Sequence, residues 1–202
     1  ETSTLTPGAR LRVATFNVEN LDPADDPARI AALATRIVGH LHSPDIVGVQ
    51  EIQDNNGPIN DGIVDASLSF GTLVGAIQAA GGPAYEFVSI DPVDDADGGE
   101  PGGNIRTGLL YDPARVRFIG RPGGTATAAV SVVAGPAGPA LSYSPGRIDP
   151  LNPAFSNSRK PLAAEFRYNG RKVFVINNHL NSKGGDDPLF GRYQPPARSS
   201  ES

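Results

Sequence analysis

The stretch DIVGVQEI, residues 45–52, decides the fold because it is an apolar run that carries an acid, Glu51, near its end. Short apolar runs bounded by turn signals are typical of strands that are buried on both sides of a sheet. A second such run, LRVATFN, occupies residues 11–17. Between the two, an Asp-Pro pair at 26–27 indicates a helix start, apolar residues follow at helical spacing, and Ser-Pro at 43–44 ends the helix. Strand, helix and strand in this order predict a βαβ-like unit, and therefore an α/β protein.

Beyond this unit the sequence predicts one more helix, at residues 67–80, and a further set of strands. The acidic, glycine-rich residues 91–104 predict a loop, and residues 122–160 are rich in Pro, Gly, Ala and Ser. Asp-Pro at 112–113 and Asn-Gly at 169–170 are turn signals, and each is expected to close a hairpin between the strands on either side. The expected strands lie at residues 85–90, 105–111, 115–121, 128–133, 162–168 and 171–178.

The composition excludes several classes of protein. The net charge is −5 and the pI about 5.1, whereas a chain that coats DNA regardless of sequence needs a basic face. A nuclease is not excluded, since a bound cation and a few basic residues can neutralise phosphates locally. The chain has no cysteine, so it forms no disulfide and uses no thiolate. No apolar run approaches the roughly 18 residues of a membrane span.

The length bounds the domain organisation. The chain has 202 residues, enough for one sizeable domain or for part of a larger one. Residues 1–10 are polar and unpatterned and predict a disordered N-terminal end, which leaves one domain over residues 11–202. The first residue is Glu1 and not methionine, so we expect a processed or trimmed form of the protein.

Three of the expected strands end in polar residues suited to phosphate. Asn17 ends the first strand, Glu51 ends the second, and the stretch VFVINNHLNSKGG, residues 173–185, carries His179 just past the last. In α/β proteins, ligands bind outside the carboxyl ends of strands. Asn17 and Glu51 offer the oxygen ligands that Mg²⁺ prefers. His179 is able to hydrogen-bond a phosphoryl oxygen or to move a proton.

Each of these residues also has a structural explanation. Asn17 fits a turn, and His179 fits a histidine whose ring is satisfied within the fold. Glu51 fits a buried salt bridge, because an unpaired buried carboxylate is costly. Taken together at the ends of three apolar strands, the residues favour a site over three unrelated structural roles.

Five segments, in this order, look like the endonuclease/exonuclease/phosphatase superfamily, whose fold is that of deoxyribonuclease I. The segments are RVATFNVENL, PDIVGVQEIQD, NIRTGLLYD, SRKPLAAEF and FVINNHLNSKGG. The closest subgroup is the bacterial extracellular nucleases, which DNNGPINDGIVDA and NHLNSKGGDDPLFGRYQPP also resemble. The resemblance runs from Arg12 to the C-terminus. It implies a four-layer α/β sandwich, in which two sheets pack face to face with helices outside.

The resemblance also implies roles for the three strand-end residues. Asn17 matches an asparagine beside the metal and the scissile phosphate. Glu51 matches the metal-binding glutamate. His179 matches the histidine that hydrogen-bonds the phosphate and serves in acid–base chemistry.

Further residues match substrate-binding positions. Arg159 matches a basic residue that reaches a phosphate, with a surface salt bridge as the alternative, and Lys183 is expected to act similarly unless it is only solvated. Arg106 and Tyr111 are expected to support the site. Ile105 aligns with a glutamate that pairs with the catalytic histidine in some deoxyribonucleases, so His179 is expected to lack that partner.

The sequence departs from the family pattern after His179. The family continues to a Gly-Asp-x-Asn motif and ends in a Ser-Asp-His motif, and neither follows here. We therefore expect a truncated chain that supplies roughly the first half of the domain and is inactive alone. Without the remaining strands, one sheet exposes an apolar face, so a missing C-terminal half or an associating chain is expected to complete the fold.

The resemblance implies a metal-dependent phosphodiester hydrolase, namely a secreted bacterial nuclease that cuts DNA, with RNA as a further candidate substrate. The implied ion is Mg²⁺, with Mn²⁺ or Ca²⁺ as alternatives. Within the superfamily, the alternatives are a phosphatase or a phospholipid phosphodiesterase, because one core serves all these substrates. Outside the enzyme class, the alternative is a non-catalytic fragment that binds metal or phosphate weakly.

Overall fold

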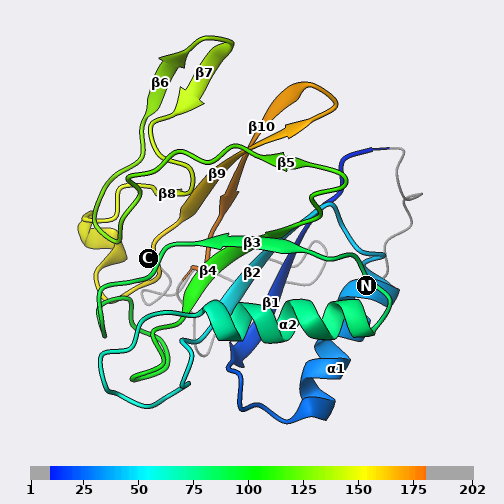
Figure 1. The fold of residues 1–202 in the computed structure, drawn as a ribbon. Helices are drawn as coiled ribbons and strands as arrows, with labels where there is room; N and C mark the ends of the chain where they lie inside the picture. Colours follow the sequence, from blue (N-terminus) through cyan, green and yellow to red (C-terminus); the bar gives the residue numbers. More distant parts are fainter. Residues whose placement is uncertain (1–9, 181–202) are drawn as a thin grey trace, which may run out of the picture.

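Two sheets and two α-helices form the body of the structure, a computed structural model that describes residues 10–180 (Figure 1). The first sheet has the order β1-β2-β4-β3, and the second has the order β10-β9-β5, with β8 also paired to β9. The strands of the first sheet are β1 (Val13–Leu21), β2 (Ile46–Ile52), β3 (Glu86–Ser89) and β4 (Arg106–Tyr111). Those of the second are β5 (Arg117–Phe118), β8 (Gly146–Arg147), β9 (Leu162–Tyr168) and β10 (Arg171–Asn177).

The predicted βαβ unit is present. β1 and β2 pair in parallel, and α1 (Pro27–Thr35) lies between them in the chain, continued by the π-helical turn η1 (Arg36–His40). The side chain of Asp26 accepts a hydrogen bond from the backbone N–H of Ala28 at 2.9 Å and so caps α1. The second predicted helix is α2 (Ser67–Ala79). No helix within residues 10–180 is long and apolar enough to cross a bilayer.

The elements are stacked in three layers. α1 and α2 cover one face of the first sheet (Figure 1), and Ile30 of α1 and Phe70 of α2 share a core with Val47 and Val49 of β2. The second sheet covers the other face, where Phe166 of β9 meets the Tyr111 ring edge-on at a centroid distance of 5.5 Å. Helices, first sheet and second sheet are successive layers of the expected α/β sandwich.

The predicted hairpin of residues 105–111 and 115–121 is wrong. β4 is a central strand of the first sheet between β2 and β3, whereas β5 belongs to the second sheet and pairs with β9. The turn at Asp112 carries the chain from one sheet to the other, because Val116 and Phe118 bury themselves against the second sheet. The continuous burial of β4 is the physical reason, since a strand buried on both faces needs two neighbours.

The strand predicted at 128–133 is displaced and belongs to a hairpin that the sequence did not indicate. β6 (Val132–Gly135) pairs with β7 (Gly138–Leu141), and this hairpin projects from the body (Figure 1). Its base is fastened by Glu165 of β9, a carboxylate that is 1% exposed. Glu165 accepts hydrogen bonds from the Arg121 guanidinium at 2.6 Å and from the Leu141 N–H at 3.2 Å.

Replacing Glu165 with glutamine is expected to destabilise the protein by about 3 kcal/mol at pH 7, because it leaves a buried ion pair broken. Burial alone would raise the pKa of Glu165, but the bonds from Arg121 and Leu141 and the charge of Lys172 outweigh it and lower the pKa. This stabilisation is therefore present above the unfolded pKa of about 4.3 and is lost as the pH falls through the folded value.

The measurement is urea unfolding between pH 7 and pH 3. The slope of stability against pH below about pH 5 should be shallower in Glu165→Gln than in the original protein. Glu19→Gln is the matched control, because Glu19 is exposed. Equal pH profiles for all three proteins would contradict the role given to Glu165.

Candidate active site

The two parallel strands of the first sheet are both irregular where they end. β1 and β2 pair in register up to Asn17 and Gln50, and the register then shifts before Leu21 pairs with Ile52. Glu51 lies in this irregular stretch with a positive φ of 62°. Bulges of this kind re-aim side chains and occur often beside active sites. Here the result is that Asn17 Nδ2 donates to Glu51 Oε1 at 2.8 Å.

His179 reaches the same carboxylate from the second sheet. It follows the end of β10, and its Nε2 lies 3.2 Å from Glu51 Oε1. On the other side of the ring, Arg159 Nε donates to His179 Nδ1, also at 3.2 Å. Since Nδ1 accepts, this network assigns the ring proton to Nε2, which donates to Glu51.

The surroundings keep the His179 ring neutral. Burial lowers its pKa most, and the positive charge of Arg159 lowers it further, against the opposing effect of Glu51. The Arg159 guanidinium is only 8% exposed, and burial lowers its pKa as well. An arginine remains charged in any protein environment, so the site holds a nearly desolvated cation beside a neutral imidazole.

Arg159 is held by a buried charge cluster behind the site. Asp97, 4% exposed, receives Arg147 Nη1 at 2.7 Å and Lys160 Nζ at 2.6 Å. The backbone carbonyl of Asp97 also accepts from Arg159 Nη1 at 3.5 Å. Three cations thus surround Asp97, two on its carboxylate and Arg159 on its backbone carbonyl, so the local charge favours an anion in front of Arg159.

Asn177 is a residue of the site that the sequence reasoning did not select. Its Nδ2 donates to the carbonyls of Val49 and Gly108, both at 2.8 Å, and its Oδ1 accepts from Gln50 Nε2 at 2.5 Å. One side chain of the second sheet is thus fastened to two strands of the first, two residues before His179. The alternation of side chains along the strand could have identified Asn177. It lies on the core-facing side of β10, where a polar side chain needs hydrogen-bond partners.

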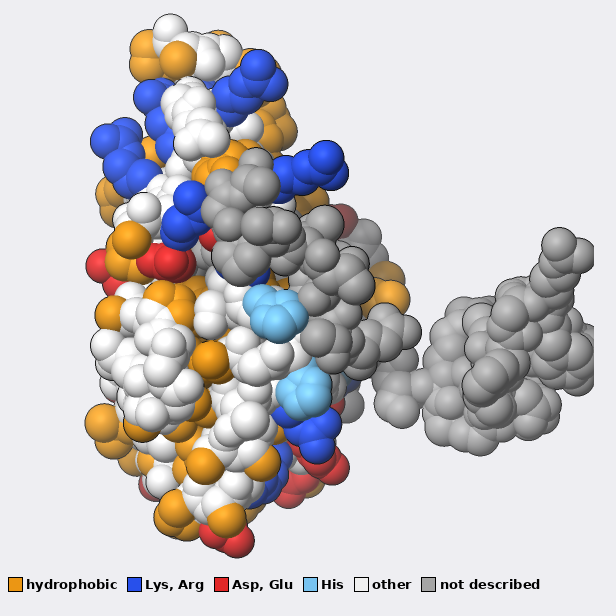
Figure 2. Space-filling model, turned by 90° about the vertical axis from the view of Figure 1, so that its right-hand side faces the viewer, with side chains coloured by type: hydrophobic (Ala, Val, Ile, Leu, Met, Phe, Trp, Pro, Cys, Tyr) orange, Lys and Arg blue, Asp and Glu red, His pale blue; other side chains and the backbone are white. Residues whose placement is uncertain are grey.

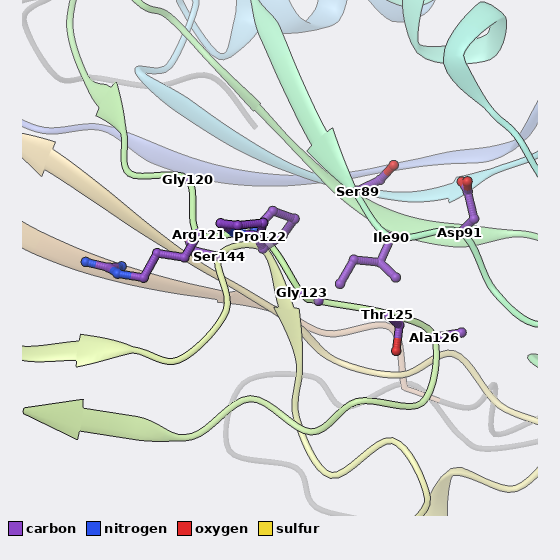
Figure 3. Close-up of a pocket in the computed structure, with 12 residues that line it drawn as sticks. Ser89, Ile90, Asp91, Gly120, Arg121, Pro122, Gly123, Thr125, Ala126 and Ser144 are labelled. Atoms are coloured by element: carbon purple, nitrogen blue, oxygen red, sulfur yellow. The ribbon is translucent and has the colours of Figure 1, made fainter.

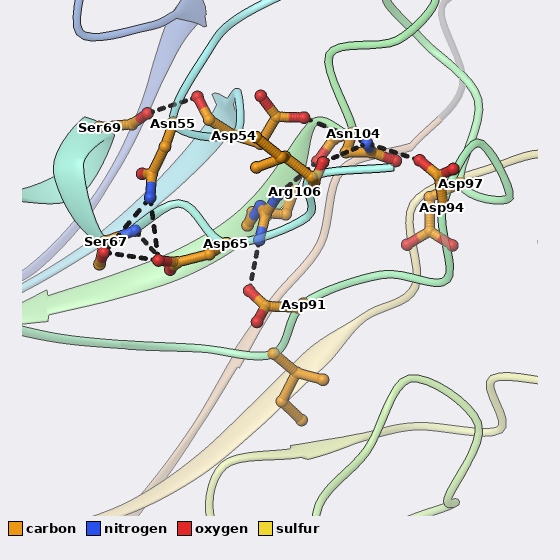
Figure 4. A network of polar contacts seen from close by, with 12 residues as sticks. Asp54, Asn55, Asp65, Ser67, Ser69, Asp91, Asp94, Asp97, Asn104 and Arg106 are labelled. Carbon is orange, nitrogen blue, oxygen red and sulfur yellow. Dashed lines mark hydrogen bonds and ion pairs between the residues drawn. The ribbon is translucent and has the colours of Figure 1, made fainter. Parts of the chain in front are cut away.

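Arg106 and Tyr111 are not brought to the other predicted residues. Arg106 is 1% exposed, and its Nη1 pairs with Asp91 at 2.5 Å (Figure 4). Tyr111 stands at the other end of β4, opposite the first residue of β2, and its hydroxyl bonds to Glu86. Lys183 lies outside the described residues.

A polar network supports the loop that follows Glu51. Asp54 is fully buried, and burial raises its pKa against the opposing hydrogen bond from Asn104. Asn104 Nδ2 lies 3.1 Å from Asp54 Oδ2 and 3.0 Å from Asp94 Oδ1 (Figure 4). The network fixes the backbone beside β2 and so helps to hold Glu51 in place.

A cavity of about 640 Å³ lies elsewhere, between the end of β3 and the glycine-rich loop after β5 (Figure 3). Its lining includes Ile90, Asp91 and Thr125 and none of the residues predicted for the site. Arg121 contributes to the wall, but its guanidinium points away from the cavity toward Glu165 (Figure 3). The candidate site is therefore the open polar surface at the strand ends and not this cavity.

The donors at the site fit a hard divalent cation of the Mg²⁺ type. Glu51 Oε1 is occupied by Asn17 and His179, while within residues 10–180 no hydrogen bond reaches Glu51 Oε2. One free carboxylate oxygen matches the requirement of Mg²⁺, which takes one or two carboxylates and keeps several waters. The part of the chain that the structure describes contains no group of three or more His, Cys, Asp or Glu side chains able to enclose a metal.

The fold is an α/β sandwich with a polar site at the carboxyl ends of its two parallel strands. The chain belongs to the Endonuclease/Exonuclease/phosphatase family, whose sequence profile matches residues 14–183. No curated protein matches the chain in sequence.

Solved structures resemble the chain at low sequence identity. A humanized D. rerio TDP2 carrying 14 mutations is 17% identical with a TM-score of 0.39, and the match covers 86% of this chain and 52% of that one. A family protein from Leptotrichia buccalis C-1013-b is 14% identical with a TM-score of 0.48, covering 88% and 57%. D. rerio TDP2 complexed with single strand DNA product is 18% identical with a TM-score of 0.38, covering 87% and 48%. The chain spans about half the length of these proteins.

Proposed function

We propose that the protein is a metal-dependent phosphodiester hydrolase that cuts DNA. The observation that carries the proposal is the continuous polar chain Asn17–Glu51–His179–Arg159, which joins the ends of both sheets through contacts of 2.8 to 3.2 Å. A carboxylate for a cation, a ring N–H and a buried guanidinium are together the groups that phosphoryl transfer requires.

The residues divide the work by their chemistry. Glu51, with the amide of Asn17, would hold Mg²⁺, which when bound polarises a phosphoryl oxygen and stabilises the leaving oxygen. The Nε2–H of His179, which donates to Glu51 in the structure, would instead donate to a phosphoryl oxygen bound beside Glu51. Arg159 adds a positive charge that cannot be lost and a planar donor set that matches a phosphate.

DNA is the proposed substrate because of the motif subgroup. Residues 54–66 and 178–196 resemble the bacterial extracellular nucleases, and on the same ground we propose that the protein acts outside the cell. We further propose that a longer form of the protein carries the two family motifs that do not follow His179, Gly-Asp-x-Asn and Ser-Asp-His.

The test is cleavage of supercoiled plasmid DNA with Mg²⁺ by this chain and by a form extended at the C-terminus. We expect cleavage by the extended form, its complete loss when a chelator removes the metal, and recovery when Mg²⁺ is restored in excess. An extended form that leaves DNA intact while hydrolysing phosphate monoesters or phospholipids would replace the nuclease proposal with one of those activities. Metal-independent cleavage would contradict the role of the cation.

A further inference from the structure

Three cations stand in a line across the second sheet. Arg167 of β9 is the register partner of Arg117 in β5 on one side and of Lys172 in β10 on the other. Register partners project from the same face, with Cβ atoms about 4.5–5.5 Å apart. We call these three residues the basic row.

The basic row lies on the outer face of the second sheet. Phe118 and Phe166, the next pair in the same register, pack into the core between the sheets. Because side chains alternate along a strand, Arg117 and Arg167 point away from that core. Lys and Arg side chains gather at the upper end of the molecule, around the β6–β7 hairpin, and acidic side chains lie below them (Figure 2).

Two of the three charges of the row have no partner among the described residues. Within residues 10–180, no ion pair or side-chain hydrogen bond is found for Arg117 or Arg167. Lys172 Nζ donates to the carbonyls of Gly138 and Pro139, and it lies 3.8 Å from Glu165, which already binds Arg121. Like charges directly opposite each other destabilise a sheet. On a chain of net charge −5, two unpaired arginines beside a lysine that shares its carboxylate with Arg121 fit an external polyanion.

We propose that the basic row binds the phosphate backbone of the nucleic acid, an inference that rests on the proposed function. The five residue steps from Lys172 to Asn177 span about 17 Å at 3.3–3.4 Å per residue. Phosphates of one strand follow at about 3.4 Å along a duplex axis. The row therefore contacts phosphates roughly five or more nucleotides from the bond at His179.

The test is binding of a fluorescently labelled 20-base-pair duplex, followed by anisotropy in the presence of a chelator so that no cleavage occurs. Arg117→Glu and Arg167→Glu are the test variants, and Arg36→Glu, at an exposed arginine of η1, is the charge-matched control. We expect each test variant to weaken binding about tenfold and to lower the slope of log affinity against log salt by about one. The control should change affinity less than twofold.

Thermal melting of each variant, with Arg117→Gln as a milder substitution, shows that the fold is kept. Equal losses in all three reversals, or no binding of the duplex by the original protein, would overturn the inference. Tighter binding to phosphatidylserine vesicles than to DNA, lost in the same variants, would overturn it in favour of a membrane surface. If the variants weaken DNA binding but the protein cuts no DNA, only the proposed hydrolysis is rejected. If the protein cuts DNA and the variants bind it as tightly as the original protein, only the role of the basic row is rejected.

Discussion

Replacing Glu51 with glutamine is expected to lower the rate of DNA cleavage by at least about 10²–10³-fold, the effect of removing one electrostatic contact of a transition state. The substitution keeps the size of the side chain and removes its charge. Glu51 Oε2 is the oxygen left open to a cation, so the variant should also need far more Mg²⁺ for half-maximal activity. The measurement is plasmid cleavage as a function of Mg²⁺ concentration.

The control for this prediction is Glu19→Gln, the same chemical change at an exposed side chain near the site. It should leave the rate and the metal requirement unchanged. A Glu51→Gln variant that keeps the original metal dependence would show that Glu51 only orients Asn17 and His179. A variant that fails to fold, seen in its urea unfolding curve, would call for Glu51→Asp as the substitute.

Replacing Asn177 with alanine is expected to lower the free energy of unfolding by about 3–5 kcal/mol. The change leaves the buried carbonyls of Val49 and Gly108 and the amide of Gln50 without their partner, and each unsatisfied group costs about 1–3 kcal/mol. Gly48 shows how closely Asn177 is packed, because a Cβ built there would lie 2.9 Å from Asn177 Oδ1. Urea unfolding measures the loss.

The neighbouring Asn178→Ala is the matched control, since Asn178 is exposed and its truncation should change stability by no more than about 0.5 kcal/mol. The two variants remove the same atoms one residue apart. Equal stabilities would mean that the carbonyls of Val49 and Gly108 find water instead, and that the two sheets are joined by apolar packing alone.

The sequence predicted the elements whose signal is local. The β1–α1–β2 unit, α2 and the β9–β10 hairpin follow from apolar periodicity, the Asp26 cap and the Asn-Gly turn. The hairpin around Asp112 failed because a turn signal says only that the chain reverses and not which sheet receives the next strand. Burial of Val116 and Phe118 against β9 decides that, and it is a long-range effect.

The candidate site also divides into residues that local sequence signals predicted and residues whose roles depend on long-range contacts. Asn17, Glu51 and His179 were selected because polar residues follow apolar strands, and the structure brings the three together with Arg159. Arg106 and Tyr111 were selected from the motif that contains them, but a motif does not tell which face or end of a strand a residue occupies. Asn177 was missed because its role depends on carbonyls of two other strands.

The left-handed backbone of Glu51 lowers the stability of the fold, while the side chain at the same residue is needed for the proposed metal site. A non-glycine residue at a φ of 62° costs roughly 1 kcal/mol or more, and glycine would relieve that cost. A directed-evolution screen for heat resistance alone would therefore reward the loss of this carboxylate. Selection for thermal stability therefore has to be combined with selection for activity. Otherwise position 51 is the first place where a substitution would raise stability and remove the proposed metal ligand.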